Sequence, residues 1–311
     1  MRTLNSLLHG SGRVKEPAAV WRLAPPAVRL HSMLALALLL ATAPVSRMSE
    51  PQLDRAIAQA HLVPAIGERV ERLSALFLGV SYGDLPLGEG TGIEPQPRWR
   101  TDLVDCQTFV ETVLAMANAK SLARARAILD DIRYAGDPPQ VSFATRNHFT
   151  EAQWLPSNAD KGYLRVETLD IDPRAPATTL ALRRGEWDKV AALKRLATAK
   201  VPEGEFRIHY LTLDEAKRRA ASIEPGSVLL VVRQHDPNRV VRVSHMGFVV
   251  RKGGRMYVRH ASTGEEHRVI DMELRRFLDK QREYKKWPVQ GVALVMPLDA
   301  QLRVSRLTAA R

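Results

Sequence analysis

The chain has 311 residues, 45% of them hydrophobic and 26% charged, which is the composition of a globular protein with a core of ordinary size. A single cysteine excludes an intramolecular disulfide. The formal net charge of +12 attracts polyanions of many kinds. Because the sequence has no zinc-finger spacing, no basic region joined to heptads and no aromatic RNA-binding motif, we expect no nucleic-acid partner.

An apolar segment, residues 33–43, follows scattered basic residues and ends in the A-x-A cleavage pattern Ala41-Thr42-Ala43. It is shorter than the about 20 residues that span a bilayer and has the length of a signal-peptide core. We predict that residues 1–43 are a signal peptide or an N-terminal anchor and that 44–311 form a single domain. The protein would then be exported to the periplasm or cell envelope, and would touch the membrane only through an uncleaved segment. A buried first helix is the alternative.

Apolar residues at helical spacing predict helices over 51–61 and 64–78, a helix that begins at Cys106, and a further helix near 121–133. The stretches between and after them are predicted loops: 79–104, rich in Gly and Pro, and 134–160, partly buried through Phe143, Phe149 and Trp154.

The second half of the chain is dominated by β-branched runs. The predicted elements are a helix over 213–222, strands over 227–233, 243–251 and 255–261, a helix over 271–281 and a strand over 289–296. Gly253-Gly254 is a hairpin turn signal. Residues 161–210 give only short strands, such as 163–169. Helices first and an antiparallel sheet second is an α+β layout.

Cys106 follows Asp105 at the start of a predicted helix. Free N–H groups and the helix dipole stabilise a thiolate there, which predicts a lowered pKa and a reactive thiol. Asp105 would cap the helix. A small core residue is the alternative interpretation of Cys106.

A cysteine nucleophile needs a base and a group that orients the base. His245 lies inside a predicted strand, and by alternation shares a face with Val243 and Gly247. The hairpin would bring His260 beside it on the next strand, where it could fix the tautomer of His245. Each histidine taken alone is more often structural.

Four motifs, in order, resemble the NlpC-type cell-wall cysteine peptidases: DCQTFVE (Asp105–Glu111), PGSVLLV (Pro225–Val231), SHMGFVV (Ser244–Val250) and RHAS (Arg259–Ser262). The resemblance implies Cys106 as nucleophile, His245 as base and His260 as orienting residue. Gln107 departs from that family, which has a small residue there.

Three segments are similar to the N-acetylmuramoyl-L-alanine amidase-like family of uncharacterised bacterial proteins, a relative of the NlpC-type enzymes: FLGVSYGDLPLG (Phe77–Gly88), LVDCQTFVE (Leu103–Glu111) and TRNHFTEAQWLPSN (Thr145–Asn158). The resemblances imply a papain-like α+β fold in which the nucleophile helix packs on an antiparallel sheet. They also imply amide hydrolysis in the peptidoglycan stem peptide, through a thioacyl-enzyme and without a cofactor.

Two bonds remain open. The amidase-like resemblance favours the lactyl–L-Ala amide, whereas the NlpC-type resemblance alone favours the bond between D-Glu and the diamino acid. A cysteine acyltransferase on the same fold and a wall-binding protein without chemistry are further alternatives.

Several polar residues outside the Cys/His set are candidate substrate contacts. Tyr82 resembles the tyrosine upstream of the cysteine in NlpC-type enzymes, and with the backbone N–H of Cys106 would stabilise an oxyanion. Asn147 and His148 would contact substrate from a loop. Tyr82 could instead only pack its loop, and the other two could hold theirs.

Cationic side chains would position the carboxylates of a stem peptide. Arg98 and Arg100 precede the nucleophile, and Arg146 lies beside the two loop candidates. Solvated surface charge is the alternative interpretation of all three.

Two other patterns suggest different chemistry. Gly79–Gly83 matches G-x-S-x-G, but that motif requires a strand before it and a helix after it, and here a helix precedes and a loop follows. His260, Glu266 and His267 form a loose cluster without H-E-x-x-H, so we expect no metal site.

Overall fold

The structure is a computed structural model that describes residues 44–185, 194 and 202–309. The predicted signal or anchor segment, residues 1–43, lies outside the described residues. None of the helices in the described part combines the length and apolar character needed to cross a membrane.

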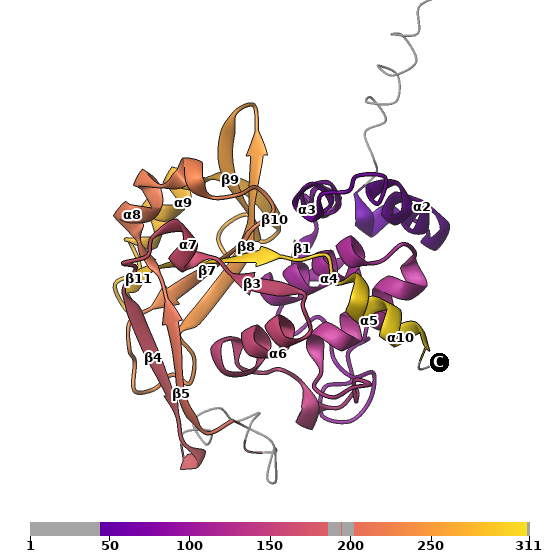
Figure 1. Ribbon diagram of the computed structural model, residues 1–311, viewed down its shortest axis with the longest axis horizontal. Coiled ribbons are helices and arrows are strands. Elements are labelled where there is room, and N and C mark those ends of the chain that lie inside the picture. The colour runs from indigo at the N-terminus through magenta and orange to yellow at the C-terminus, as the bar shows by residue number, and fades with distance from the viewer. Residues whose placement is uncertain (1–43, 186–193, 195–201, 310–311) are drawn as a thin grey trace, which may run out of the picture. The chain divides into compact units, whose positions relative to one another are not determined.

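Helices gather on one side of the structure (Figure 1). They are α2 (Glu50–Ala60), α3 (Ile66–Ala75), α4 (Cys106–Asn118), α5 (Leu122–Arg133), α6 (Leu155–Asp160) and α10 (Gln301–Ala309). Helix α4 is central, because every residue from Thr108 to Asn118 is buried.

A seven-stranded sheet adjoins the helices, with strand order β10-β9-β8-β7-β11-β3 and β6 paired to β11. Its strands are β3 (Leu164–Val166), β6 (Leu211–Thr212), β7 (Val228–Arg233), β8 (Val243–Lys252), β9 (Arg255–Ala261), β10 (Val269–Glu273) and β11 (Val289–Pro297). Every pairing in it is antiparallel. The fold is therefore mixed α and β around an antiparallel sheet, as predicted at that level.

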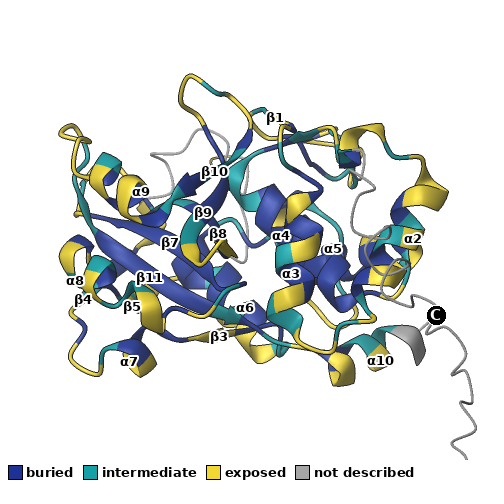
Figure 2. Ribbon diagram, turned by 90° about the horizontal axis from the view of Figure 1, so that it is seen from above, coloured by how far each residue is buried: buried dark blue, intermediate teal, exposed yellow. Residues whose placement is uncertain are grey.

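Both faces of the sheet are covered. Val228, Leu230 and Val232 of β7 join the cluster that contains α4, whereas Leu229 and Val231 join a second cluster. The second cluster is covered by α8 (Leu213–Arg218) and α9 (Leu274–Gln281). Figure 2 shows the buried strands between helices whose outer faces are exposed. This double cover explains why β7 is continuously apolar rather than alternating.

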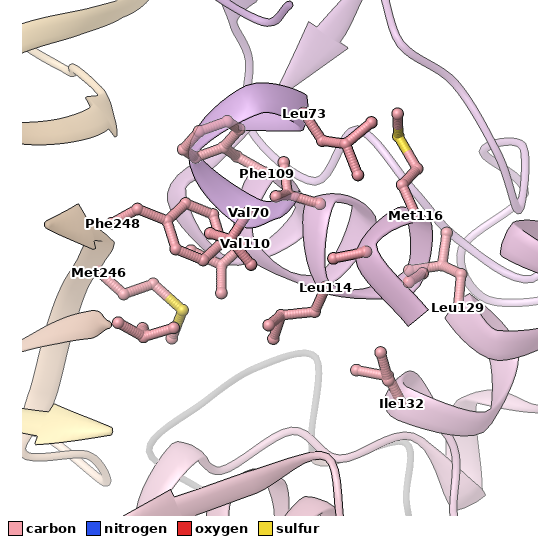
Figure 3. Close-up of a cluster of buried hydrophobic side chains, with 14 of the residues drawn as sticks. Val70, Leu73, Phe109, Val110, Leu114, Met116, Leu129, Ile132, Met246 and Phe248 are labelled. Atoms are coloured by element: carbon pink, nitrogen blue, oxygen red, sulfur yellow. The ribbon is translucent and has the colours of Figure 1, made fainter. Parts of the chain in front are cut away.

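The contact between α4 and β8 fixes the helix that begins at Cys106. Phe109 lies 5.5 Å from the Phe248 ring in an edge arrangement, and Met246 joins the same cluster. Figure 3 shows these side chains with Val70 of α3 and other residues of α4 and α5. The start of α4 is thus seated against the middle of β8.

The remaining elements are short: η1 (Val45–Arg47), β1 (Ser81–Tyr82), β2 (Leu103–Val104), η2 (Phe143–Thr145), η3 (Thr150–Trp154), α7 (Thr168–Ile171), β4 (Ala177–Leu182), β5 (Gly204–His209) and η6 (Ala220–Ser222). Strands β4 and β5 form a separate two-stranded antiparallel sheet, which the sequence did not predict.

Most predicted elements are confirmed, including the four N-terminal helices and the hairpin turn at Gly253-Gly254. The helix predicted over 271–281 was partly wrong, because Val269–Glu273 pair with β9 and only Leu274–Gln281 are helical. The C-terminal tail, which was given no structure, forms α10.

Candidate active site

Cys106 is the first residue of α4, as predicted. Asp105 caps the helix: its carboxylate accepts from the Thr108 backbone N–H at 2.7 Å, and its own N–H donates to Thr108 Oγ1 at 3.0 Å. The thiol therefore lies at a helix start that two reciprocal hydrogen bonds between Asp105 and Thr108 hold in place.

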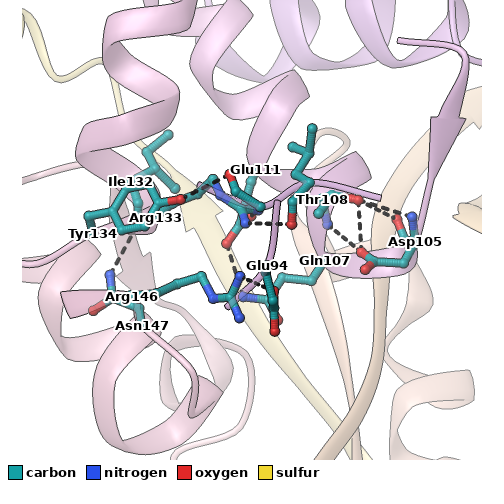
Figure 4. Close-up of polar contacts among 12 residues, drawn as sticks. Glu94, Asp105, Gln107, Thr108, Glu111, Ile132, Arg133, Tyr134, Arg146 and Asn147 are labelled. Carbon is teal, nitrogen blue, oxygen red and sulfur yellow. Dashed lines mark hydrogen bonds and ion pairs between the residues drawn. The ribbon is translucent and has the colours of Figure 1, made fainter. Parts of the chain in front are cut away.

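A buried polar network fixes this end of α4 from behind (Figure 4). Gln107 Nε2 donates to Glu111 at 2.9 Å, and Glu111 accepts from Arg133 of α5 at 2.7 Å. Arg133 also donates to the Leu87 carbonyl at 3.4 Å, in the loop before the nucleophile. Gln107, which departs from the NlpC pattern, thus binds its own helix instead of lining the pocket.

His245 and His260 lie side by side, as predicted. The His245 Nε2 and His260 Nδ1 atoms are 2.9 Å apart, and the rings are nearly perpendicular. Phe277 of α9 packs against both rings, with centroid distances of 6.3 and 5.1 Å. The His260 Nε2 atom has no hydrogen-bond partner among the described residues.

A β-bulge aims the first histidine. Val231 pairs with His245 but Val232 pairs with Val243, so Ser244 is the extra residue. The predicted shared face of Val243 and His245 is therefore wrong: Val243 joins the core cluster that contains α4, whereas Ser244 and His245 both line a pocket.

Gly247 allows strand β9 to approach closely. A Cβ atom at this position would lie 2.6 Å from the Arg259 carbonyl oxygen and 2.8 Å from the His260 Cβ. Pairing between β8 and β9 ends at Phe248 and Arg259, just where this approach begins. The missing side chain therefore lets the His260 ring reach His245.

The end of the β8–β9 ladder also frees a donor for the cysteine. The backbone N–H of Val249 points toward β7, where it donates to the Ser227 carbonyl. Because N–H directions alternate along a strand, the N–H of Met246, three residues earlier, points toward β9, beyond the last β8–β9 pair. A backbone hydrogen bond from Met246 to the Cys106 sulfur opposes, without reversing, the rise of the thiol pKa that burial causes. The strand that carries His245 thus also contacts the nucleophile candidate.

A pocket of about 180 Å³ unites Tyr82, Cys106, His245 and His260. Tyr82 stacks on His267 at 5.6 Å, and its hydroxyl donates to an Asp84 oxygen at 3.2 Å. Burial, then the neighbouring Cys106, raises the pKa of Tyr82, so its hydroxyl stays protonated and able to donate.

Both titrating groups of the pair are neutral in the free protein. Burial, and then the Asp105 charge, raises the pKa of the Cys106 thiol to about 12, although backbone hydrogen bonds oppose the rise. Burial, then the charges of His260 and Arg233, holds the pKa of His245 well below its usual value. The lowered thiol pKa predicted from the helix start is wrong, because burial of the thiol, and then the neighbouring Asp105 carboxylate, outweigh the helix-start hydrogen bonds.

The proposed arginine contacts to substrate need correction, because all three are already paired. Arg146 forms ion pairs with Glu94 at 2.5 Å and Glu89 at 3.3 Å, and it does not line the pocket. Arg98 and Arg100 each pair with one nearby aspartate. These guanidinium groups brace the loop and helices around α4.

Asn147 and His148 are structural as well. Asn147 is buried and donates to the Ile132 carbonyl at 3.1 Å. The His148 Nε2 atom lies 2.6 Å from the Phe143 carbonyl oxygen, and burial lowers the pKa of His148 to about 4. Neither residue lines the pocket. Their contacts fit the alternative interpretation, in which they stabilise their own loop.

The other two patterns lack their required geometry. Ser81 is exposed in β1, after helix α3 and before a loop, and does not line the pocket. Among the described residues, no three His, Cys, Asp or Glu side chains converge in a way that could hold a metal ion.

Sequence reasoning missed the far wall of the pocket. Arg233 ends β7, and Phe277, Lys280 and Tyr284 come from α9 and the turn after it. The one local signal for this wall was an arginine at the end of an apolar strand. The other wall residues come together only through tertiary packing, which sequence patterns do not reveal.

A helix-start cysteine beside a sheet-borne histidine pair defines this as a mixed α and β protein with a candidate thiol–imidazole site. The chain belongs to the N-acetylmuramoyl-L-alanine amidase-like family, whose model matches residues 72–284. The resemblance to that family is thereby confirmed. At the level of the family, membership supports an amidase-like hydrolase function directed at peptidoglycan.

Solved structures share the fold. A Legionella pneumophila protein of the DUF1460 family has 23% identity and a TM-score of 0.70, covering 80% of this chain and 94% of its own. A Bacteroides uniformis N-acetylmuramoyl-L-alanine amidase has 21% identity and a TM-score of 0.59, covering 75% and 99%. A Bacteroides fragilis protein proposed to be a xylanase has 20% identity and a TM-score of 0.56, covering 71% and 98%. No curated protein matches the chain significantly.

The raised pKa predicts slow alkylation of the resting thiol. The rate of iodoacetamide modification at Cys106 should keep rising above pH 8.5, the free-cysteine reference, because the thiol stays protonated through that range. The urea-unfolded chain, which has the same single cysteine, is the matched control and should titrate near about 8.5. A rate plateau below pH 8 in the folded protein would contradict the assignment.

Gly247→Ala should separate the two imidazoles. We expect a loss of about 1–3 kcal/mol in the free energy of unfolding, because the new methyl overpacks a close backbone contact, together with altered imidazole ¹⁵N shifts of His245 and His260. Gly254→Ala is the control: it strains a turn with φ of 77° but meets no atom of the described residues within 4 Å, so it should leave those shifts unchanged. Unchanged shifts in Gly247→Ala would refute the steric argument.

Proposed function

We propose that the protein is a cysteine amidase of peptidoglycan, with Cys106 as nucleophile, His245 as general base and His260 as orienting residue. The observation that carries this is the 2.9 Å contact between His245 and His260 in a pocket shared with the helix-start thiol. A nucleophile, a base and an orienting group in one pocket meet the requirement of covalent amide hydrolysis.

The reaction needs the His245 tautomer that carries its proton on Nε2. In that tautomer Nε2–H donates to His260 Nδ1, 2.9 Å away, and the other nitrogen, Nδ1, is left to accept the thiol proton. The Cys106 thiolate attacks the amide carbonyl, and His245 passes the proton to the leaving amine. Water, activated by the same imidazole, then cleaves the thioester.

The free enzyme does not hold a thiolate–imidazolium pair in this scheme. Because the pKa of the thiol is raised and that of His245 lowered, proton transfer accompanies attack on the bound substrate. The backbone N–H of Cys106 at the start of α4 is the proposed donor to the oxyanion. The Tyr82 hydroxyl would join it by turning its single proton from Asp84 toward the substrate.

The arrangement of elements supports a papain-like, NlpC-type fold, in which the nucleophile helix packs on an antiparallel sheet. Helix α4 contacts β8 through Phe109 and Phe248, and the base and orienting residue lie on neighbouring strands. Export to the periplasm or envelope, directed by residues 1–43, would bring this site to its polymer.

The three residues should differ in their effects on turnover. Cys106→Ala should be inactive, and His245→Ala should lose about 100- to 10,000-fold in kcat, because it removes the proton carrier. His260→Asn should lose no more than about 100-fold, because an amide oxygen can replace Nδ1. Ser81→Ala, exposed and outside the pocket, is the control and should keep wild-type turnover. Equal losses at both histidines would mean that the roles are misassigned.

Digestion of purified muropeptides followed by mass spectrometry tests the bond. We expect release of intact stem peptides with a free L-Ala amine. Sugar-linked L-Ala-D-Glu with a free diamino-acid amine would identify an endopeptidase instead. Products joined to an added amine would identify an acyltransferase, and no product from the folded wild type would leave a wall-binding role.

A further inference from the structure

Arg233 is a buried cation on the wall of the candidate active site. It ends strand β7, is 8% exposed, and lines the same pocket as Cys106 and His245. No carboxylate forms an ion pair with it among the described residues, although most buried arginines of this structure have one, such as Arg133 with Glu111. A buried charge without a counter-ion is costly, so its retention needs a reason.

The guanidinium is held in place by neutral groups. Its Nε donates to Ser244 Oγ at 2.7 Å and its Nη1 to the Trp287 carbonyl at 2.6 Å. It also lies 4.6 Å from the Tyr284 ring centroid and 5.4 Å from that of Trp287. Nη2 makes no hydrogen bond to any described residue, so the fork keeps a donor for a ligand.

The pocket around Arg233 is cationic. Lys280 is its other charged lining residue, and no Asp or Glu is among the described residues that line it. Two acidic residues outside the lining set bond to pocket residues: Glu266 accepts from Ser262 at 3.1 Å, and Asp84 accepts from Tyr82 at 3.2 Å. The pocket, at about 180 Å³, is smaller than the roughly 300 Å³ of a typical small-ligand site, so it admits one anionic part of a larger molecule.

We propose that Arg233 binds a carboxylate of the substrate and thereby sets which amide reaches Cys106. This inference rests on the proposed peptidoglycan amidase function. Arg233 bonds Ser244, the bulge residue directly before His245, so the anchor and the base are joined through one backbone step. Guanidinium groups bind carboxylates as a planar fork. The α-carboxylate of the D-glutamyl residue is the ligand, since it lies within one residue of either candidate bond.

The test compares two synthetic substrates on the full-length protein. They are N-acetylmuramyl tripeptides that differ only in the D-glutamyl α-group, which is a carboxylate in one and a carboxamide in the other. Wild type should prefer the carboxylate. Arg233→Gln should raise KM for the carboxylate substrate by about 10- to 100-fold, as expected for loss of one charged hydrogen-bonded contact, with a smaller change in kcat and little change for the carboxamide.

Matched variants separate binding from structure. Arg239→Gln removes a second cation that lies over Trp287, at 5.1 Å, but outside the pocket, and should behave as wild type. Arg233→Lys keeps the charge and loses the fork, so its preference for the carboxylate should be reduced but present. That variant decides the question if Arg233→Gln fails to fold, and an unchanged preference in it would overturn the proposal.

The outcomes also separate this inference from the function on which it rests. Turnover of neither substrate by folded wild type would refute the amidase function itself. Turnover of both with equal KM, or an equal rise of both KM values in Arg233→Gln, would overturn the carboxylate anchor and leave the amidase function standing. A carboxylate-selective loss in Lys280→Gln but not in Arg233→Gln would also overturn it.

Discussion

The close approach of β9 to β8 at Gly247 is the constraint on which the site depends. Only a residue without a side chain lets the Arg259 carbonyl and the His260 Cβ come this near. The approach places His260 Nδ1 within hydrogen-bonding distance of His245. It also ends the strand ladder, which releases the Met246 N–H toward the cysteine. The absence of a side chain at Gly247 therefore helps to bring Cys106, His245 and His260 together.

Sequence patterns correctly predicted the features that depend on interactions between residues close together in the chain. The helix start at Cys106, its Asp105 cap and the hairpin that pairs the histidines each follow from short-range signals. The bulge at Ser244 was missed because strict alternation has no term for an extra residue. Strand β10 was missed because its partner is β9, which its own periodicity does not reveal.

Tertiary partners decide what charged residues do, and sequence spacing does not reveal partners. Arg146 lies in a motif that resembles the family, but its guanidinium is already paired with Glu94 and Glu89. Arg233 ends a predicted strand but was not among the candidate site residues, and no carboxylate of the described residues shares the pocket with it. The helix dipole at Cys106 was foreseeable from the sequence. The burial that raises the thiol pKa, and the added effect of the Asp105 charge, depend on how the helix start is packed.

The protonation of His245 links the catalytic pair to the proposed carboxylate anchor. Burial and the charges of His260 and Arg233 disfavour the imidazolium in the free protein. A carboxylate bound at Arg233 would cancel the last of these charges, which raises the pKa of His245 and makes it a better acceptor for the Cys106 proton. Burial, the largest cause of the lowered pKa, would remain, so the bound carboxylate would strengthen the base without creating it. The anchor would thus contribute to specificity in two ways, by binding the carboxylate and by favouring proton transfer to His245 when the carboxylate is present.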